Sequence, residues 1–384
     1  MQQGARPESE SRLVALAYVG GILTASAIAF AFFVFLASRI GFQTIWEKTG
    51  VSLTGAVLDM PDELIDELTA MHAVIGNAGN PTGAKKHDTI VSRPDDELGW
   101  VLRPNVSVDG YQLRALDPVN LDPPVLYMSS GSPMSDALTK YLDENARTLY
   151  RYSFDGDGHR RTIPEVEAEK KILMVGDSGL FGVGVNDGDT IASNLQRLVG
   201  NSHRVVNAGV GGYGGEQASA AARLLSDRED FDILVYVAHH NDFYEPGHIA
   251  NPEKARTIIA GFESLKDRFP GGIVVALLSY LEYTGADVLR AHGWQRDRIE
   301  AADRLRAEFP AISAEAGFPF VDWTDIADEI REHEGTIFSP WALYIDHAHL
   351  SVRGNRLFAE RIHAAFPNQP SSRRSPPPSG RQST

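Results

Sequence analysis

The chain has 384 residues and a formal net charge of −15, and 43% of its residues are apolar. This length and composition allow a sizeable core in one large or two modest domains. The acidic balance disfavours duplex nucleic acid as a partner, because binding the phosphate backbone needs a basic face. The chain contains no cysteine, which excludes disulfides and thiolate catalysis but leaves the compartment open.

An uncharged apolar stretch occupies residues 13–38, between Arg12 and Arg39. As a helix it would be roughly 39 Å long, enough to cross a hydrocarbon core of about 30 Å. Cleaved signal peptides have a shorter apolar region and a small-residue cleavage site. We therefore expect an uncleaved single-pass membrane anchor, preceded by a short tail at 1–12. The flanking basic residues lean slightly toward a cytoplasmic N-terminus, which would place the rest of the chain in the periplasm or outside the cell.

Residues 40–165 are interpreted as an accessory region or linker. From about residue 88 this region has many Asp, Pro and Gly residues between short apolar segments, which indicates irregular and β structure, and no motif in it predicts chemistry. It could be a lid, a spacer or a second carbohydrate-contacting layer. The tail at 367–384 is rich in Pro, Ser and Arg, and we expect it to be disordered.

From about residue 168 the pattern becomes regular, because short apolar runs alternate with helical patterns. The predicted strands are 171–175, 204–207, 233–238, 272–278 and 318–322. Runs that are apolar on both faces are typical of parallel strands covered by helices. One predicted helix spans 252–269, with Asn251 as its N-cap and Pro252 at its first position, and another begins at Ser351. Residues 168–366 are therefore predicted to form a three-layer α/β/α sandwich with a central parallel sheet.

Polar candidates follow several of these strands at their carboxyl ends, where ligands bind in open α/β sheets. The first strand leads into Gly176-Asp177-Ser178, the second into the glycine-rich run 207–214 and the third into 239–242. The pair Asp346 and His349 follows the fifth strand, just before the last helix. Each of these four segments alone is weak evidence for a function. Together, in this order, they predict acyl chemistry at a serine.

With these four blocks, residues 168–366 resemble the SGNH hydrolase (GDSL esterase) family, whose members carry Ser, Gly, Asn and His in four separated blocks. Gly176-Asp177-Ser178 matches the nucleophile block, and 207–212 matches the glycine block. Asn241-Asp242 matches the asparagine block, and 346–349 matches the closing Asp-x-x-His. The resemblance implies a flavodoxin-like SGNH fold. The family usually has a glycine two residues before the asparagine, where this chain has His239, a departure that could reshape the oxyanion pocket.

The roles of the matched residues follow from the chemistry of acyl transfer. Ser178 would attack the carbonyl, His349 would act as general base and then general acid, and Asp346 would orient the imidazole. The oxyanion donors would be the backbone N–H of Ser178 and of Gly212 and the side-chain amide of Asn241. Gly211 is the alternative to Gly212, which the spacing favours. Asp177 is expected to make turn hydrogen bonds.

Two other kinds of site were weighed against this prediction. A metal centre could use the polar side chains of the third and fourth blocks, which are His239, His240, Asp242, Asp346, His347 and His349. They lack the i, i+4 spacing of a zincin helix. Residues 209–214 fit the dinucleotide pattern G-x-G-x-x-G, but on the second strand of the domain, and that interpretation leaves Ser178 and Asn241 unexplained. We expect no metal and no cofactor.

Aromatic residues flank the third and fourth blocks at Phe243, Tyr244, Trp341 and Tyr344. They could stack on a sugar ring or line an acyl pocket, or they could pack in the core.

The sequence therefore predicts a membrane-anchored serine esterase. Its substrate would be an acyl ester, such as an O-acetyl group, on an envelope or extracellular carbohydrate, or a small or lipid ester. Two alternatives stay open: an O-acyltransferase that modifies a polysaccharide with the same triad, and a non-catalytic envelope protein that keeps the fold. The expected partners are the ester substrate and the membrane. The oligomeric state stays open.

Overall fold

The structure is a computed structural model. It describes residues 63–64, 91–113, 126–128, 135–245, 249–279, 296–334, 342–345 and 348–367. The predicted anchor at 13–38 and all but the first residue of the predicted tail lie outside these ranges. Within them, no helix combines the length and the apolar character needed to span a bilayer.

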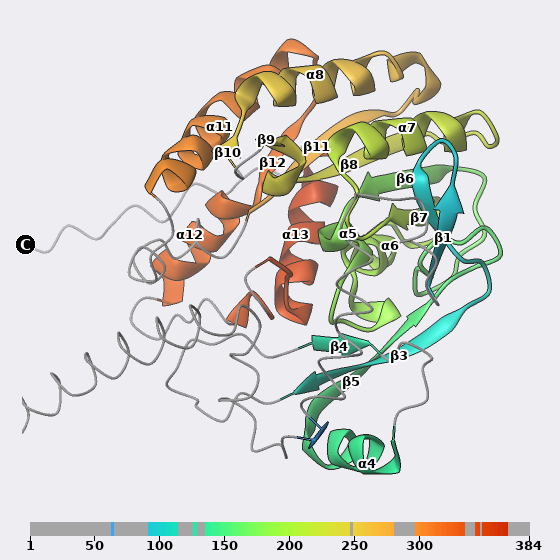
Figure 1. The fold of residues 1–384 in the computed structure, drawn as a ribbon. Coiled ribbons are helices and arrows are strands. Elements are labelled where there is room, and N and C mark those ends of the chain that lie inside the picture. Colours follow the sequence, from blue (N-terminus) through green and yellow to red (C-terminus); the bar gives the residue numbers. More distant parts are fainter. Residues whose placement is uncertain are drawn as a thin grey trace, which may run out of the picture. The chain divides into compact units, whose positions relative to one another are not determined.

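A five-stranded parallel sheet forms the centre of the fold (Figure 1). Its strands are β6 (Lys171–Gly176), β7 (Arg204–Gly209), β8 (Ile233–His239), β11 (Gly272–Leu278) and β12 (Phe320–Asp322). They lie in the order β12-β11-β8-β6-β7, and all four neighbouring pairs are parallel. The chain therefore reverses its direction of travel across the sheet between β6 and β8. In such sheets this switch point is where ligands bind.

Helices cover both faces of the sheet, so the predicted α/β fold with a central parallel sheet is confirmed. One face packs against α7 (Gly215–Ser226), α8 (Pro252–Glu263) and α11 (Arg296–Glu315). The other face packs against α5 (Ser178–Phe181), α6 (Ile191–Val199), α12 (Trp323–Glu334) and α13 (Val352–Ala364). Two separate apolar clusters fill the spaces between the layers.

The predicted helix starts at Asn251 and Ser351 are confirmed. The Asn251 side chain accepts a hydrogen bond from the backbone N–H of Glu253, and Ser351 accepts one from Gly354. Helix α8 ends at Glu263 rather than at 269, because the chain then tightens into a 3-10 turn at Lys266–Arg268. The apolar residues after Glu263 still reach the core.

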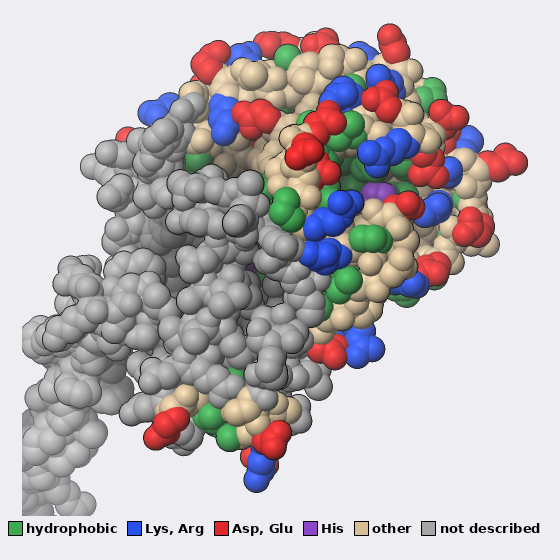
Figure 2. Space-filling view, turned by 45° about the vertical axis from the view of Figure 1, so that its right-hand side comes forward, with side chains coloured by type: hydrophobic (Ala, Val, Ile, Leu, Met, Phe, Trp, Pro, Cys, Tyr) green, Lys and Arg blue, Asp and Glu red, His purple; other side chains and the backbone are tan. Residues whose placement is uncertain are grey.

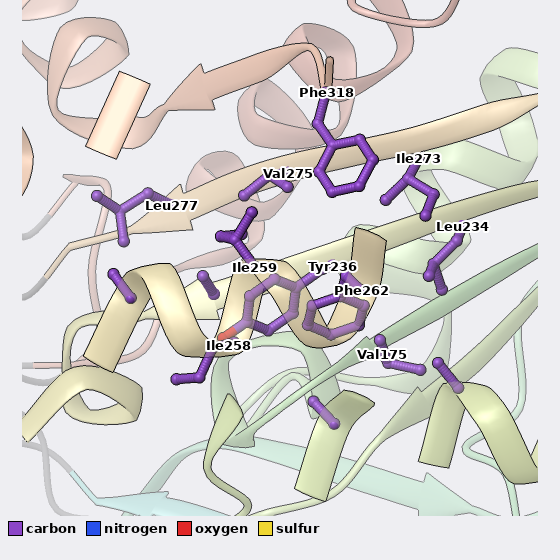
Figure 3. Packing of buried hydrophobic residues seen from close by; sticks show 14 of the residues in the cluster. Val175, Leu234, Tyr236, Ile258, Ile259, Phe262, Ile273, Val275, Leu277 and Phe318 are labelled. Atoms are coloured by element: carbon purple, nitrogen blue, oxygen red, sulfur yellow. The ribbon is translucent and has the colours of Figure 1, made fainter. Parts of the chain in front are cut away.

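Side chains from α8 lie over the middle of the sheet (Figure 3). Ile258, Ile259 and Phe262 come from the helix, and Tyr236 and Val275 come from the strands below it. The rings of Tyr236 and Phe262 are stacked with their centroids 4.3 Å apart. Burying each of these side chains contributes about 1.5–3 kcal/mol, so this layer stabilises the packing of α8 on the sheet.

Strands precede the parallel sheet, as the composition of this stretch predicts, and they pair antiparallel. Strands β1 (Ser92–Asp95) and β2 (Gly99–Leu102) form a hairpin. Strands β3 (Ser107–Leu113), β4 (Leu126–Met128) and β5 (Ala146–Ser153) form a second sheet, with α4 (Asp136–Asn145) between β4 and β5 in the sequence. Two short strands, β9 (Tyr244–Glu245) and β10 (Ile249–Ala250), pair after β8. On the described part of one face, acidic and basic side chains are interspersed (Figure 2).

Candidate active site

The chain turns sharply at the end of β6, and this turn presents Ser178. Asp177 caps helix α5, and its Oδ1 accepts a hydrogen bond from the backbone N–H of Gly179 at 2.8 Å. Gly176 has no room for a side chain, because an added Cβ would lie 2.5 Å from the carbonyl oxygen of Val237. Ser178 is the first residue of α5 and is partly exposed. A partly exposed hydroxyl at a strand end is what a serine nucleophile requires.

The buried carboxylate of Asp177 joins this turn to the end of β8. Its Oδ2 accepts a hydrogen bond from Asn241 Nδ2 at 3.2 Å. The same oxygen lies 3.4 Å from Ser178 Oγ and 3.5 Å from His239 Nδ1. Buried carboxylates need such partners, because an unpaired buried charge is costly. The turn hydrogen bonds expected of Asp177 are therefore confirmed, and the contact with Asn241 comes in addition to them.

Asn241 lies in the 3-10 turn His240–Phe243, which directly follows β8. Its Nδ2 points to Asp177, and its Oδ1 lies 2.9 Å from His239 Nδ1. Because an amide oxygen only accepts hydrogen bonds, Nδ1 carries the hydrogen and the amide has one preferred orientation. Asn241 is partly exposed. The structure thus brings Asn241 and the Ser178 turn to the same edge of the sheet, as the strand pattern predicts.

The other polar side chains of this turn have partners in the interior. Asp242 accepts a hydrogen bond from the Tyr236 hydroxyl at 2.6 Å, and burial raises the pKa of Asp242 well above its usual value. His240 Nδ1 lies 3.3 Å from the carbonyl oxygen of Leu278, and burial lowers the pKa of His240 to about 3. These contacts weaken the metal-centre alternative. Among the described residues, the side chains close enough to share one ion lie in a different turn, at Asp155, Asp157 and His159.

The glycine-rich loop after β7 lies beside the nucleophile turn. A Cβ added at Gly211 would lie 4.0 Å from the Cβ of Ser178. Gly212 has a φ of 82°, in the left-handed region that favours glycine, and it is exposed. The loop therefore lies beside Ser178, and the assignment of an oxyanion donor to Gly212 stays a prediction.

His349 lies in the loop before α13. Its carbonyl oxygen accepts a hydrogen bond from the backbone N–H of Ile345 at 2.9 Å, and its side chain is partly exposed. Its ring lies close enough to His239 to influence the pKa of that residue. Asp346 and His347 lie outside the described residues. The pairing of Asp346 with His349, and the triad as a whole, stay predictions.

Comparison with protein families gives one match. Residues 174–357 match the model of the GDSL-like lipase/acylhydrolase family. All four blocks fall inside this range. Residues 174–357 are a GDSL-like lipase/acylhydrolase domain. The resemblance inferred from the sequence is confirmed, and the domain is that of a serine ester hydrolase.

Several solved structures resemble the GDSL-like domain. LAE5, an alpha/beta hydrolase enzyme from the metagenome of Lake Arreo, is 18% identical with a TM-score of 0.41, over 52% of this chain and 95% of that chain. A catalytic mutant of Axe2, an acetylxylan esterase from Geobacillus stearothermophilus, is 18% identical with a TM-score of 0.40, over 52% and 96%. A carbohydrate acetylesterase family member from Sinorhizobium meliloti is 19% identical with a TM-score of 0.38, over 50% and 95%. Likenesses at these values say nothing about substrate. No curated protein matches the chain.

A tryptophan outside the GDSL-like domain borders its glycine loop. Trp100, in β2, donates a hydrogen bond from Nε1 to the carbonyl oxygen of Gly211 at 3.3 Å, and its Cζ2 lies 3.4 Å from where a Cβ of Gly212 would be. The Tyr213 hydroxyl donates to the Trp100 carbonyl oxygen at 2.5 Å. Trp100 is partly exposed. Sequence reasoning missed it, because one tryptophan in a loop-rich stretch gives no pattern.

An arginine outside the GDSL-like domain supports the segment that follows the nucleophile. The buried Arg160 donates from Nη1 to the carbonyl oxygens of Phe181 and Gly182 at 2.6 and 2.5 Å, and from Nη2 to that of Val185 at 2.6 Å. Its Nε lies 3.2 Å from Asp187 Oδ1. Hydrogen bonds from a charged donor are strong and directional. Arg160 therefore fixes the chain directly after the nucleophile helix, and this role also left no signal in the sequence.

The aromatic residues singled out from the sequence lie mainly in the core. Phe243 and Tyr344 are buried in the two apolar clusters on either side of the sheet, and Tyr244 packs against one of them. Trp341 lies outside the described residues. Core packing is thus the outcome for Phe243 and Tyr344, and Trp100 is the aromatic ring beside the glycine loop.

Proposed function

We propose that this chain is a serine esterase in which Ser178 is the nucleophile, His349 the general base and acid, and Asp346 the residue that orients His349. The contact that carries this proposal is the hydrogen bond between Asn241 Nδ2 and Asp177 Oδ2 at 3.2 Å. It joins the asparagine block to the nucleophile turn at the switch point of the sheet, where ligands of such folds bind. The GDSL-like domain supports ester hydrolysis as the reaction class.

In the proposed reaction, His349 takes the proton of Ser178 Oγ as this oxygen attacks the ester carbonyl. The carbonyl oxygen becomes an oxyanion, which accepts hydrogen bonds from the backbone N–H groups of Ser178 and Gly212 and from the amide of Asn241. When the intermediate collapses, the alcohol leaves with the proton from His349. Water then attacks the acyl-enzyme, His349 accepts its proton and returns it to Ser178, and the carboxylic acid is released.

We further propose that the substrate is an acyl ester on a carbohydrate, such as an O-acetyl group. The support is the partly exposed ring of Trp100 beside Gly211 and Gly212. An aromatic ring gives a sugar a large, rigid and partly apolar contact next to the reacting carbonyl. The hydrogen bond from its indole to the loop holds the ring in place.

The segment 13–38 is proposed to anchor the protein in the membrane, with the GDSL-like domain outside the cytoplasm. The support is its uncharged apolar sequence. Membrane fractions should retain the full chain after alkaline carbonate extraction, and protease added to intact spheroplasts should cleave the domain. Release by carbonate, or protection from the protease, would contradict anchoring or orientation respectively.

Turnover of p-nitrophenyl acetate and of acetylated oligosaccharides by the purified chain tests the proposed reaction. Ser178→Ala should lower kcat at least about a thousandfold with little change in thermal stability, since loss of the nucleophile removes the covalent route. Ser202→Ala is the matched control, because Ser202 is an exposed serine whose hydroxyl bonds the Val199 carbonyl oxygen. Its activity should equal that of the wild type. Retained activity in Ser178→Ala would overturn the proposal.

A further inference from the structure

One buried imidazole contacts three of the four blocks. His239 ends β8 and is 1% exposed. Its Nδ1 lies 2.9 Å from Asn241 Oδ1 and 3.5 Å from Asp177 Oδ2. The backbone of Ala348 and the ring of His349 both lie close enough to the imidazole to influence its pKa. A single side chain therefore contacts the nucleophile turn, the asparagine block and the loop that carries the proposed base.

These contacts determine the orientation of the Asn241 amide. The amide oxygen of Asn241 accepts the Nδ1–H of His239, so the amide nitrogen faces Asp177 and the nucleophile turn. Burial lowers the pKa of His239, although the Asp177 carboxylate opposes this effect. The ring is therefore neutral near pH 7 and keeps its single hydrogen for the amide. A glycine at 239 could make none of these contacts.

We propose that His239 is a positioning residue, which fixes the oxyanion donor Asn241 and the His349 loop relative to the Ser178 turn. This inference rests on the proposed function. In a site of this kind, small displacements of the reacting groups are expensive: a misplacement of about 1 Å can cost about a hundredfold in rate. A buried side chain that bonds Asn241 and lies close to the His349 loop reduces such displacements. The departure from the family pattern at 239 is thus part of the catalytic framework.

The test uses the full chain in detergent, with p-nitrophenyl acetate as substrate. His239→Ala should lower kcat about 10- to 100-fold and change KM less than about threefold, because positioning matters most in the transition state. It should slow fluorophosphonate labelling of Ser178 by a similar factor. His239→Asn keeps a donor near the position of Nδ1 but is too short to reach Ala348. It should therefore recover part of the lost kcat.

His240→Ala is the matched control. His240 is the next residue, is fully buried and has its Nδ1 3.3 Å from the Leu278 carbonyl oxygen. This variant should lose stability to a similar extent while its kcat stays within about threefold of the wild type. An equal loss of kcat in His240→Ala would mean that any disturbance of this turn impairs the enzyme, and it would overturn the inference. Should His239→Ala fail to fold, the comparison of His239→Asn with His240→Ala decides.

A double-mutant cycle tests whether His239 acts through Asn241. In an Asn241→Ala background, the loss of kcat caused by His239→Ala should be at least about fivefold smaller than in the wild type. Equal losses in the two backgrounds would contradict a role in positioning Asn241. Wild-type kcat in His239→Ala, with an inactive Ser178→Ala, would overturn this inference and leave the proposed function standing. Full activity in Ser178→Ala would instead overturn the proposed function.

Discussion

The parallel sheet and the antiparallel segment that precedes it are held in place in different ways. The sheet is held by continuous backbone pairing and by apolar clusters on both faces. The preceding segment packs a smaller cluster, with Phe154 and Tyr152 against Phe181, at the β7 edge. It then reaches the loops of the candidate site through polar contacts, among them those of Arg160 and Trp100. Repeated pairing and packing thus hold the sheet, and individual long-range contacts connect the preceding segment to its loops.

Replacing Arg160 should weaken the attachment of the preceding segment more than any other proposed substitution. Arg160→Met should lower the free energy of unfolding by about 3–5 kcal/mol, because the Asp187 carboxylate and three buried carbonyl oxygens lose their donor. Chemical denaturation of the purified protein measures the loss. Arg160→Lys keeps the charge with fewer donors and should lose less. Unchanged stability in Arg160→Met would mean that the segment contributes little to the domain.

A substitution at the sheet edge should lower kcat far more than it lowers stability. Asn241→Ala should lower kcat by about 10²–10³ while KM changes little, because the amide acts on charge that develops in the transition state. Steady-state kinetics with p-nitrophenyl acetate separate the two constants. A raised KM with an unchanged kcat would remove Asn241 from the oxyanion site.

The ring of Trp100 should matter for substrate more than for stability. Trp100→Ala should lower kcat/KM on acetylated oligosaccharides about tenfold, with a much smaller loss on p-nitrophenyl acetate, since the ring offers contact area to a sugar. Arg223→Ala is the control. It removes the exposed ion pair between Arg223 and Glu97 of the hairpin and leaves the ring, so it should change little. Equal losses on both substrates would contradict a contact with the sugar.

Low pH should lower the free energy of unfolding, because the buried His240 stays neutral in the folded protein. Its pKa of about 3 in the folded protein lies below the usual value, so the unfolded chain takes up a proton that the folded chain does not. The stabilisation is complete above about pH 6.5 and is lost as the pH falls toward 3. Between pH 7 and 5.5 the wild type should lose about 1 kcal/mol more than His240→Gln in urea denaturation. Equal losses in the two proteins would contradict a buried neutral imidazole.

The sequence predicted the parts of the molecule that depend on repeating patterns. The five strands and the caps at Asn251 and Ser351 follow from local periodicity and helix-end chemistry. The meeting of Asn241 with the Ser178 turn follows from where parallel strands end. Trp100 and Arg160 could not be found in this way. Each acts alone, and its partners are distant in the sequence, so only the folded chain places it beside the loops it supports.

The sequence also could not decide whether the aromatic residues beside the blocks lie in the site or in the core. Nearness in sequence to the blocks made Phe243 and Tyr344 candidates for the site as well as for the core, and the structure buries both. A residue next to a block in the sequence can still turn its side chain into the core. His239 was a departure visible in the sequence, yet its contacts with Asp177 and Asn241 needed the fold.

Mass-spectrometric mapping of a fluorophosphonate adduct tests the central claim most directly. The account predicts one adduct, on the peptide that contains Ser178, formed at a rate that His349→Ala lowers at least about a hundredfold. An adduct on another serine, or labelling of Ser178 that is indifferent to His349, would contradict it.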